Sequence, residues 1–203
     1  MRRRGGVLMA AGALAMSGLA LSGCARLEHP TVAPAPSVSE PAGSQEFEAA
    51  PSPSPSPKPA KAAGGTCRML DYDSAEKATG TRFEVAAAST SSGAQTCALQ
   101  VLYSEHPDLV VSVVSTEADA KAFAKAAPDE AKKVDGIGKA AYSRVVDPDP
   151  DAGTGPAVEV AWLSGKGDIV TVRYTNSADV DLDTARGSVD RIVSYAKGLE
   201  AAR

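Results

Sequence analysis

Ala157-Val-Glu-Val-Ala-Trp-Leu163, Ser164-Gly-Lys-Gly-Asp168 and Ile169-Val-Thr-Val-Arg-Tyr-Thr175 are three consecutive stretches that together decide the fold. The two outer stretches are rich in β-branched and aromatic residues, which favour strands. The central stretch has the Gly-rich, polar composition of a tight turn. The sequence therefore predicts an antiparallel hairpin over 157–175.

Further strands and helices are predicted on both sides of this hairpin. Residues 83–88, 96–103, 109–114 and 140–146 have the composition of strands. Helices are expected at 70–79, where Gly80 ends the helix, at 116–127, and at 182–199, where apolar residues recur at three- and four-residue steps. We expect an α+β fold: an antiparallel sheet of about five to six strands with helices on one face.

The N-terminal segment has the pattern of an export signal. Three arginines, Arg2 to Arg4, precede an apolar run that ends in Leu21-Ser22-Gly23-Cys24. A transmembrane helix is an alternative, but the run is short of the roughly 20 apolar residues that spanning requires. A second alternative is an ordinary secretory signal whose cleavage site contains a cysteine.

Leu21-Ser22-Gly23-Cys24 resembles the lipobox of bacterial lipoproteins. The resemblance implies cleavage between Gly23 and Cys24 and a diacylglyceryl group, carrying chains such as palmitate, on Cys24. More than one acyl chain makes membrane attachment stable. The expected location is the extracytoplasmic face of the cell membrane.

Residues 24–65 are predicted to be a disordered tether and residues 66–203 a single domain. The tether contains Pro51-Ser-Pro-Ser-Pro-Ser-Pro57 and almost no large apolar residue. Alternating prolines favour extended conformations, so it would reach from roughly 35 Å as a coil to about 125 Å fully extended. A Pro-rich ligand or a glycosylated segment is an alternative to a spacer.

The charge of the chain argues against a nucleic-acid partner. The chain has 21 basic and 25 acidic residues. Without Arg2, Arg3 and Arg4, 18 basic residues remain against 25 acidic ones, so the mature form carries about −7. Binding to phosphates needs a face rich in Lys and Arg.

Cys67 and Cys97 form an even pair once Cys24 is assigned to the anchor. In an oxidising compartment such a pair predicts a disulfide. Two separate buried thiols are the alternative.

Catalytic residues are scarce. The chain has two histidines, His29 in the tether and His106 before Pro107, and no serine lies in a GxSxG motif. We expect His106 to be a solvated loop residue. Gly136-Ile-Gly138-Lys-Ala-Ala141 superficially fits a dinucleotide fingerprint, but it is expected to follow a helix and to open a strand, which is the wrong context.

Asp147, Asp149 and Asp151 place carboxylates at alternate positions, as in a calcium loop. The sixth position lacks the expected glycine and the twelfth lacks a glutamate, so a solvated acidic loop is favoured and these residues are only weak metal candidates. No cofactor is expected. Trp162 and Tyr174 could line a ligand cleft, although core positions are favoured.

Taken together, the lipobox, the Pro/Ser tether, Cys67 before a short helix, and Cys97 in a strand resemble small lipoproteins of actinobacteria. The stretch Val134-Asp-Gly-Ile-Gly-Lys-Ala-Ala-Tyr142 looks like a turn that recurs in uncharacterised families there. This resemblance implies an extracytoplasmic, disulfide-bonded domain and carries over no catalytic residue.

The leading hypothesis is a non-enzymatic binding or accessory module of the cell envelope. Its partner would be a membrane protein, a cell-wall polymer or an apolar small molecule held between sheet and helices. The alternatives are an envelope hydrolase that uses Asp and Glu, and a calcium-dependent binding module.

Overall fold

The computed structural model describes residues 58–203. The export signal, Cys24 and most of the predicted tether lie outside the described residues. Two short 3-10 helices come first, η1 (Ala60–Ala63) and η2 (Gly65–Met69). Ala60 is 2% exposed, so the packed part of the chain begins before the predicted boundary at residue 66.

The described chain contains a seven-stranded antiparallel sheet with the order β1-β2-β3-β7-β6-β5-β4. The strands are β1 (Val85–Ser91), β2 (Ala94–Gln100), β3 (Asp108–Ser115), β4 (Lys132–Val134), β5 (Ala140–Val146), β6 (Thr154–Leu163) and β7 (Asp168–Ser177). The predicted α+β architecture is confirmed. So is the hairpin over 157–175, which joins β6 to β7 and pairs Trp162 with Val170.

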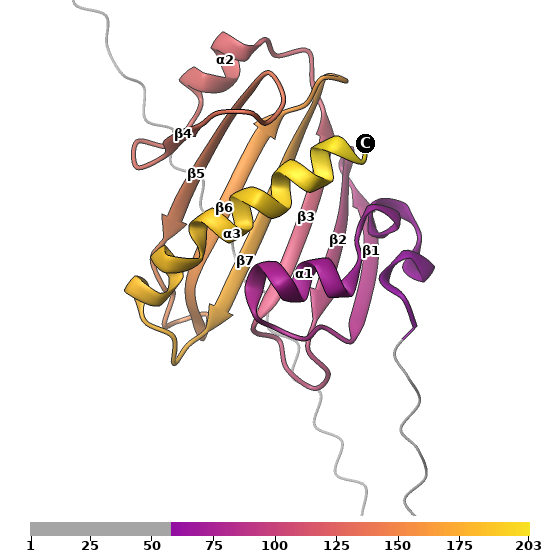
Figure 1. The fold of residues 1–203 in the computed structure, drawn as a ribbon, viewed down its shortest axis with the longest axis vertical. Coiled ribbons are helices and arrows are strands. Elements are labelled where there is room, and N and C mark those ends of the chain that lie inside the picture. Colours follow the sequence, from indigo (N-terminus) through magenta and orange to yellow (C-terminus); the bar gives the residue numbers. More distant parts are fainter. Residues whose placement is uncertain (1–57) are drawn as a thin grey trace, which may run out of the picture. The chain divides into compact units, whose positions relative to one another are not determined.

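Two helices, α1 (Tyr72–Thr79) and α3 (Leu182–Ala201), cover one face of the sheet, where they lie side by side (Figure 1). Strand side chains alternate between the two faces. The helix-covered face receives the largest buried side chains, including Trp162, Leu99 and Leu109. Ile192 and Leu199 of α3 pack against them, so the main core lies between this face and the helices.

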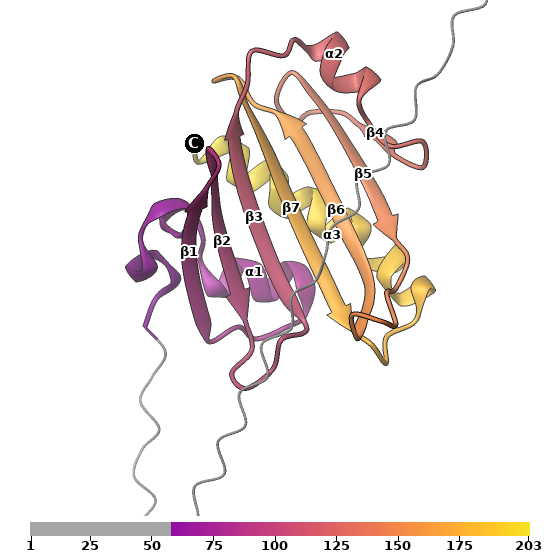
Figure 2. The same ribbon diagram turned by 180° about the vertical axis from the view of Figure 1, so that it is seen from behind.

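Among residues 58–203, little covers the opposite face, as Figure 2 shows. Within this part of the chain, only the short helix α2 (Ala120–Lys125) lies over it, at the end where β6 meets β7. Phe123 of α2 is buried against Ala161 and Leu163, and its ring stacks on Tyr142 with centroids 5.7 Å apart. This second, smaller cluster fixes α2 to the sheet.

Helix α2 is shorter than the predicted helix over 116–127. Asp119 is its N-cap and accepts a hydrogen bond from the backbone N–H of Ala122 at 2.7 Å. The hydroxyl of Thr116 accepts from Ala118 N–H, which holds the preceding residues in a turn. Side chains that bind nearby backbone groups compete with helix formation, so the helix begins four residues later than predicted.

Strand β4 is absent from the sequence-based expectation. It has three residues, and its two lysines are exposed, so no alternation of apolar and polar residues marks it. It pairs with β5 through Val134 and Ala141. The glycines of Gly136-Ile-Gly138 therefore follow a strand, not a helix as predicted, and form the turn of the β4–β5 hairpin.

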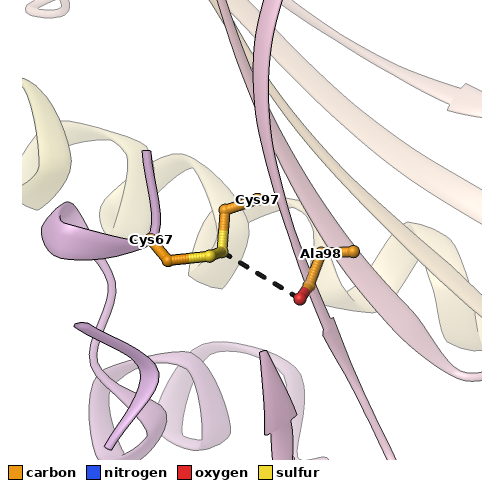
Figure 3. Close-up of a disulfide and its surroundings, with 3 residues drawn as sticks. All are labelled: Cys67, Cys97 and Ala98. Carbon is orange, nitrogen blue, oxygen red and sulfur yellow. Dashed lines mark hydrogen bonds between the residues drawn. A yellow bond between two sulfur atoms is a disulfide. The ribbon is translucent and has the colours of Figure 1, made fainter. Parts of the chain in front are cut away.

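Cys67 and Cys97 have the geometry of a disulfide. Their Sγ atoms are 1.94 Å apart and their Cα atoms 5.0 Å apart. Figure 3 shows that the bond joins η2 to β2. Both cysteines are fully buried, so the disulfide links η2 covalently to the core of the domain.

Within residues 58–203, no helix combines the length and the apolar character needed to cross a membrane.

Candidate functional site

A groove of about 600 Å³ lies between α1 and α3 on the outer side of the helix layer. We call it the α1–α3 groove. Its lining comes from the end of η2, from α1 and from the C-terminal half of α3. The lining residues are Met69, Asp71, Ser74, Lys77, Ala78, Asp190, Arg191, Ser194, Tyr195, Gly198, Leu199 and Ala202.

The N-terminus of α1 is fixed by Asp71. Its Oδ2 accepts hydrogen bonds from Ser74 N–H at 3.0 Å and from Ser74 Oγ at 2.8 Å. These bonds, from the Ser74 hydroxyl first and its backbone second, hold the pKa of the Asp71 carboxyl below its usual range. Gly80, with φ of +80°, ends the helix in the left-handed conformation that glycine tolerates. The α1 wall therefore carries an ionised carboxylate at neutral pH.

The α3 wall carries the polar residues Asp190, Arg191 and Ser194, followed towards the C-terminus by small and apolar residues. Asp181 caps this helix by accepting from Thr184 N–H at 2.7 Å. One side of its C-terminal half places Tyr195 and Leu199 against the core, with Gly198 and Ala202 beside them. Because glycine and alanine have little or no side chain, space remains between this helix and α1.

Tyr195 is the most deeply buried polar residue of the groove lining. The residue is 9% exposed, and its hydroxyl is buried without a hydrogen-bond partner among the described residues. Burial raises the pKa of this phenol, and the negative charge of Asp71 raises it further. The hydroxyl therefore remains protonated and is able both to donate and to accept.

The hydroxyls of the groove are not arranged for nucleophilic catalysis. Ser74 Oγ donates to Asp71, and Ser194 Oγ donates to the Asp190 carbonyl at 2.8 Å. No histidine is among the lining residues that could accept a proton from either serine. Asp71, with its lowered pKa, is also a poor proton donor at neutral pH. Neither serine of the lining therefore has the base that a serine nucleophile needs.

A second hollow, of about 990 Å³, lies at the β4–β5 edge beside α3. Its lining mixes valines with many charged side chains, several of which are already paired. Lys133 contacts Asp135 at 2.7 Å, and Arg144 contacts Glu159 at 2.9 Å. The hollow does not contain either of the two residues of the described chain, Tyr195 and Arg203, that have a buried side-chain atom without a hydrogen-bond partner.

His106 lies in the connection between β2 and β3, as predicted, but it is not simply solvated. Its Nδ1 is 3.0 Å from Asp108 Oδ1, and its side chain is 24% exposed. Ser104 Oγ donates to the carbonyl of His106 and not to its ring. The structure therefore brings His106 and Asp108 together without a serine nucleophile on the other ring nitrogen.

The acidic loop has a structural role at Asp149. Asp149 Oδ1 accepts from the backbone N–H groups of Asp151 and Ala152, at 3.1 and 3.2 Å. All three aspartates, Asp147 included, are exposed. Among the described residues, no group of three His, Cys, Asp or Glu side chains is placed to hold a metal ion.

Trp162 and Tyr174 are core residues and line neither hollow. Trp162 is fully buried, and its Nε1 donates to Glu200 Oε2 at 2.8 Å. Tyr174 is 5% exposed, and its hydroxyl is 2.8 Å from Thr81 Oγ1. Of the two interpretations left open by the sequence, the structure supports the core.

Gly136 and Gly138 serve the turn between β4 and β5. Both have positive φ, +80° and +52°. A Cβ on Gly138 would lie 2.2 Å from the carbonyl oxygen of Leu163, so this glycine also permits close contact with β6. The residues therefore have a backbone role in place of a phosphate-binding one.

Sequence reasoning missed Tyr195 and the α1–α3 groove. The predicted apolar stripe of the last helix includes Ile192, Ala196 and Leu199 but passes over Tyr195, which lies between them. The available signal was the pair of small residues, Gly198 and Ala202, that follow Tyr195 at three- and seven-residue spacing on a helix. The lipidation and cleavage residues, Cys24 and Gly23, lie outside the described part of the chain.

Comparison with protein-family models, with curated proteins and with solved structures finds no match for this chain.

Proposed function

We propose that this protein is a lipid-anchored, extracytoplasmic binding module without catalytic activity of its own, and that it binds its ligand in the α1–α3 groove. The observation that carries the ligand site is that Tyr195 lines a mostly apolar groove and has a buried hydroxyl without a partner in the described chain. Ligand sites are commonly concave, mostly apolar and supplied with a few polar groups, with volumes of roughly 300–1,000 Å³.

The proposed anchor rests on the N-terminal sequence alone. Arg2 to Arg4, the apolar run and Leu21-Ser22-Gly23-Cys24 form the basis for lipidation of Cys24. The Pro-rich tether would hold the domain away from the bilayer, so that the groove remains accessible to a ligand.

The anchor is tested by expressing the full chain and its Cys24→Ala variant in a bacterium that processes lipoproteins. We expect the wild-type chain in the membrane fraction, with mass spectrometry showing acyl chains on an N-terminal Cys24. The variant should lack them. A wild-type chain with an unmodified Cys24 would contradict this part of the proposal.

The groove is tested with two substitutions on the same helix. Gly198 lines the groove, and a Cβ there would meet nothing within 4 Å. Gly198→Leu therefore fills open space in the groove. Gly187→Leu is the matched control, because Gly187 also lies in α3 and is equally unobstructed but does not line the groove.

Both substitutions replace a helical glycine, so both are expected to keep or raise helix stability. The purified full-length chains are extracted with organic solvent and the extracts analysed by mass spectrometry. We expect a small apolar compound from the wild type and from Gly187→Leu, and its loss from Gly198→Leu. The same compound in equal yield from all three would exclude the groove as its site.

A further inference from the structure

The chemistry of the α1–α3 groove narrows the class of its ligand, an inference that rests on the function proposed above. The first element is the apolar part of the lining. Met69, Ala78, Leu199 and Ala202 offer hydrocarbon surface, and Leu199 and Ala78 are themselves almost fully buried. Removal of hydrocarbon from water favours an occupant with an apolar chain or ring system.

The second element is the charge balance of the lining. It contains two acidic residues, Asp71 and Asp190, and two basic residues, Lys77 and Arg191. A ligand with a net charge would meet equal numbers of like and opposite charges there. It would also lose the hydration of its charge without a dedicated partner, which is costly. The balance therefore favours a neutral ligand.

The third element is the pair of polar groups that remain for the head of the ligand. Tyr195 is protonated and has no partner among the described residues, so it can donate or accept one hydrogen bond. Asp71 lines the same groove, and an ionised carboxylate can only accept. A ligand hydroxyl meets both requirements, because one oxygen accepts from Tyr195 while its hydrogen is donated to Asp71. An ether or an ester oxygen cannot donate.

We propose that the α1–α3 groove binds a neutral amphiphile with a hydroxylated head, of the class of long-chain alcohols and monoacylglycerols. Its apolar part lies along Met69 and Leu199, and its hydroxyl fills the position that Tyr195 leaves unpaired. The hydroxyl of Tyr195 is closed to bulk solvent. The ligand therefore reaches it through the groove, with a small displacement of the side chains above it.

The test uses four probes with the same ten-carbon chain and different heads: 1-decanol, decyl methyl ether, decanoate and decyltrimethylammonium. Binding to the full chain carrying Cys24→Ser is followed by NMR through the amide shifts of residue 198 and Ala202, two positions in the lining of the groove. The proteins compared are this chain, the same chain with Tyr195→Phe, and the same chain with Gly198→Leu.

We expect 1-decanol to bind roughly tenfold more tightly than the ether, the size of one good hydrogen bond. Tyr195→Phe should weaken the binding of 1-decanol and of the ether alike, because both oxygens lose the hydrogen bond that they accept from Tyr195, while 1-decanol keeps its advantage through donation to Asp71. The same substitution should raise the melting temperature of the unliganded protein, because it removes an unsatisfied buried hydroxyl. If Tyr195 did not contact the ligand, Tyr195→Phe would not both lower the affinity for 1-decanol and raise the melting temperature of the unliganded protein.

Two outcomes separate failure of this inference from failure of the proposed function. Equal binding of 1-decanol and the ether, unaffected by Tyr195→Phe, would contradict the proposal that the ligand has a hydroxylated head group. The groove would still be an apolar binding site. Tighter binding of either charged probe would also contradict the proposed ligand class. No groove shifts with any probe, or shifts that survive Gly198→Leu, would overturn the proposed site itself.

Discussion

Trp162 and Glu200 join the centre of the sheet to the last turn of α3. The indole Nε1 donates to Glu200 Oε2 at 2.8 Å, and Oε1 of the same carboxylate accepts from Gly165 N–H at 3.1 Å. One side chain thus satisfies a fully buried indole and the turn between β6 and β7. It also positions the end of α3 that forms a wall of the groove.

Glu200→Ala is expected to lower the free energy of unfolding by about 1–3 kcal/mol, because the buried indole N–H loses its acceptor. Glu200→Gln should cost less, since one amide oxygen can still accept from Trp162. Urea unfolding followed by Trp162 fluorescence measures both. Lys197→Ala, an exposed change on the same helix, is the control. Equal stability of all three variants would mean that the bond contributes nothing.

Replacing Cys67 and Cys97 together with serine should destabilise the domain by roughly 3–4 kcal/mol, the chain-entropy effect of opening a loop of this length. The two residues are 30 apart in sequence. Thermal unfolding with and without a reductant measures the loss. The double variant should be insensitive to the reductant. A wild-type melting temperature that is also insensitive would contradict the prediction, provided that the bond is shown to be reduced.

Gly138→Ala is expected to be strongly destabilising, by more than the roughly 1–2 kcal/mol that a left-handed conformation costs a residue with a Cβ. The added Cβ would lie 2.2 Å from the Leu163 carbonyl oxygen. Gly93→Ala is the control, because its φ is +82° but nothing lies within 4 Å of the new Cβ. The denaturant midpoint of Gly93→Ala measures the cost of the backbone conformation alone. The further decrease in the midpoint of Gly138→Ala measures the cost of the close contact.

Acid should weaken the domain through two of its helix caps, Asp71 and Asp181. Hydrogen bonds from Ser74 lower the pKa of Asp71, and those from Thr184, led by its backbone N–H, lower the pKa of Asp181. Both carboxyls have lower pKa values folded than their ordinary 3.8. Their contribution is therefore present above that pH and is lost as the pH falls through the folded-state values.

The double variant Asp71→Asn, Asp181→Asn should retain both helix caps, since asparagine is also a good N-cap. Its stability should depend less on pH below about pH 4 than that of the wild type. Urea midpoints at a series of pH values provide the measurement. Identical acid profiles would show that other carboxyls dominate.

Glu159→Gln tests the ion pair on the uncovered face of the sheet. Glu159 is 7% exposed and accepts from Arg144 Nε at 2.9 Å and from Arg144 NH2 at 3.2 Å. Glutamine keeps the shape and loses the charge. We expect a loss of about 1–2 kcal/mol, because Arg144 is itself partly exposed and solvent screens the pair. Combination with Arg144→Met in a double-mutant cycle isolates the pairwise energy.

The elements that sequence predicted well are those with a strong local signal. The hairpin around Ser164–Asp168 and the helix from Leu182 have clear periodicity and turn or cap residues, so burial of their apolar faces leaves few alternatives. The stop at Gly80 is also local. Strand β4 could not be predicted in this way, because Lys132 and Lys133 are exposed and the strand exists only through its pairing with β5.

The candidate site was beyond sequence reasoning for a related reason. The α1–α3 groove is made where two helices far apart in sequence leave a space, and no local pattern encodes the distance between them. Tyr195 has the spacing of a core residue, and only its surroundings show that its hydroxyl lacks a partner. Asp71 likewise has the sequence signature of a cap and no other.

The position of the bond between Cys67 and Cys97 has a mechanical consequence. Tension on the N-terminal segment acts first on η1, whose Ala60 is buried, and at Cys67 passes through the sulfur atoms into β2. Residues 68–96, which include α1, form a covalent side branch that carries none of the load transmitted through the disulfide. Once η1 has detached, a molecule pulled by its N-terminus would therefore bear the force in β2, while α1 remained unloaded.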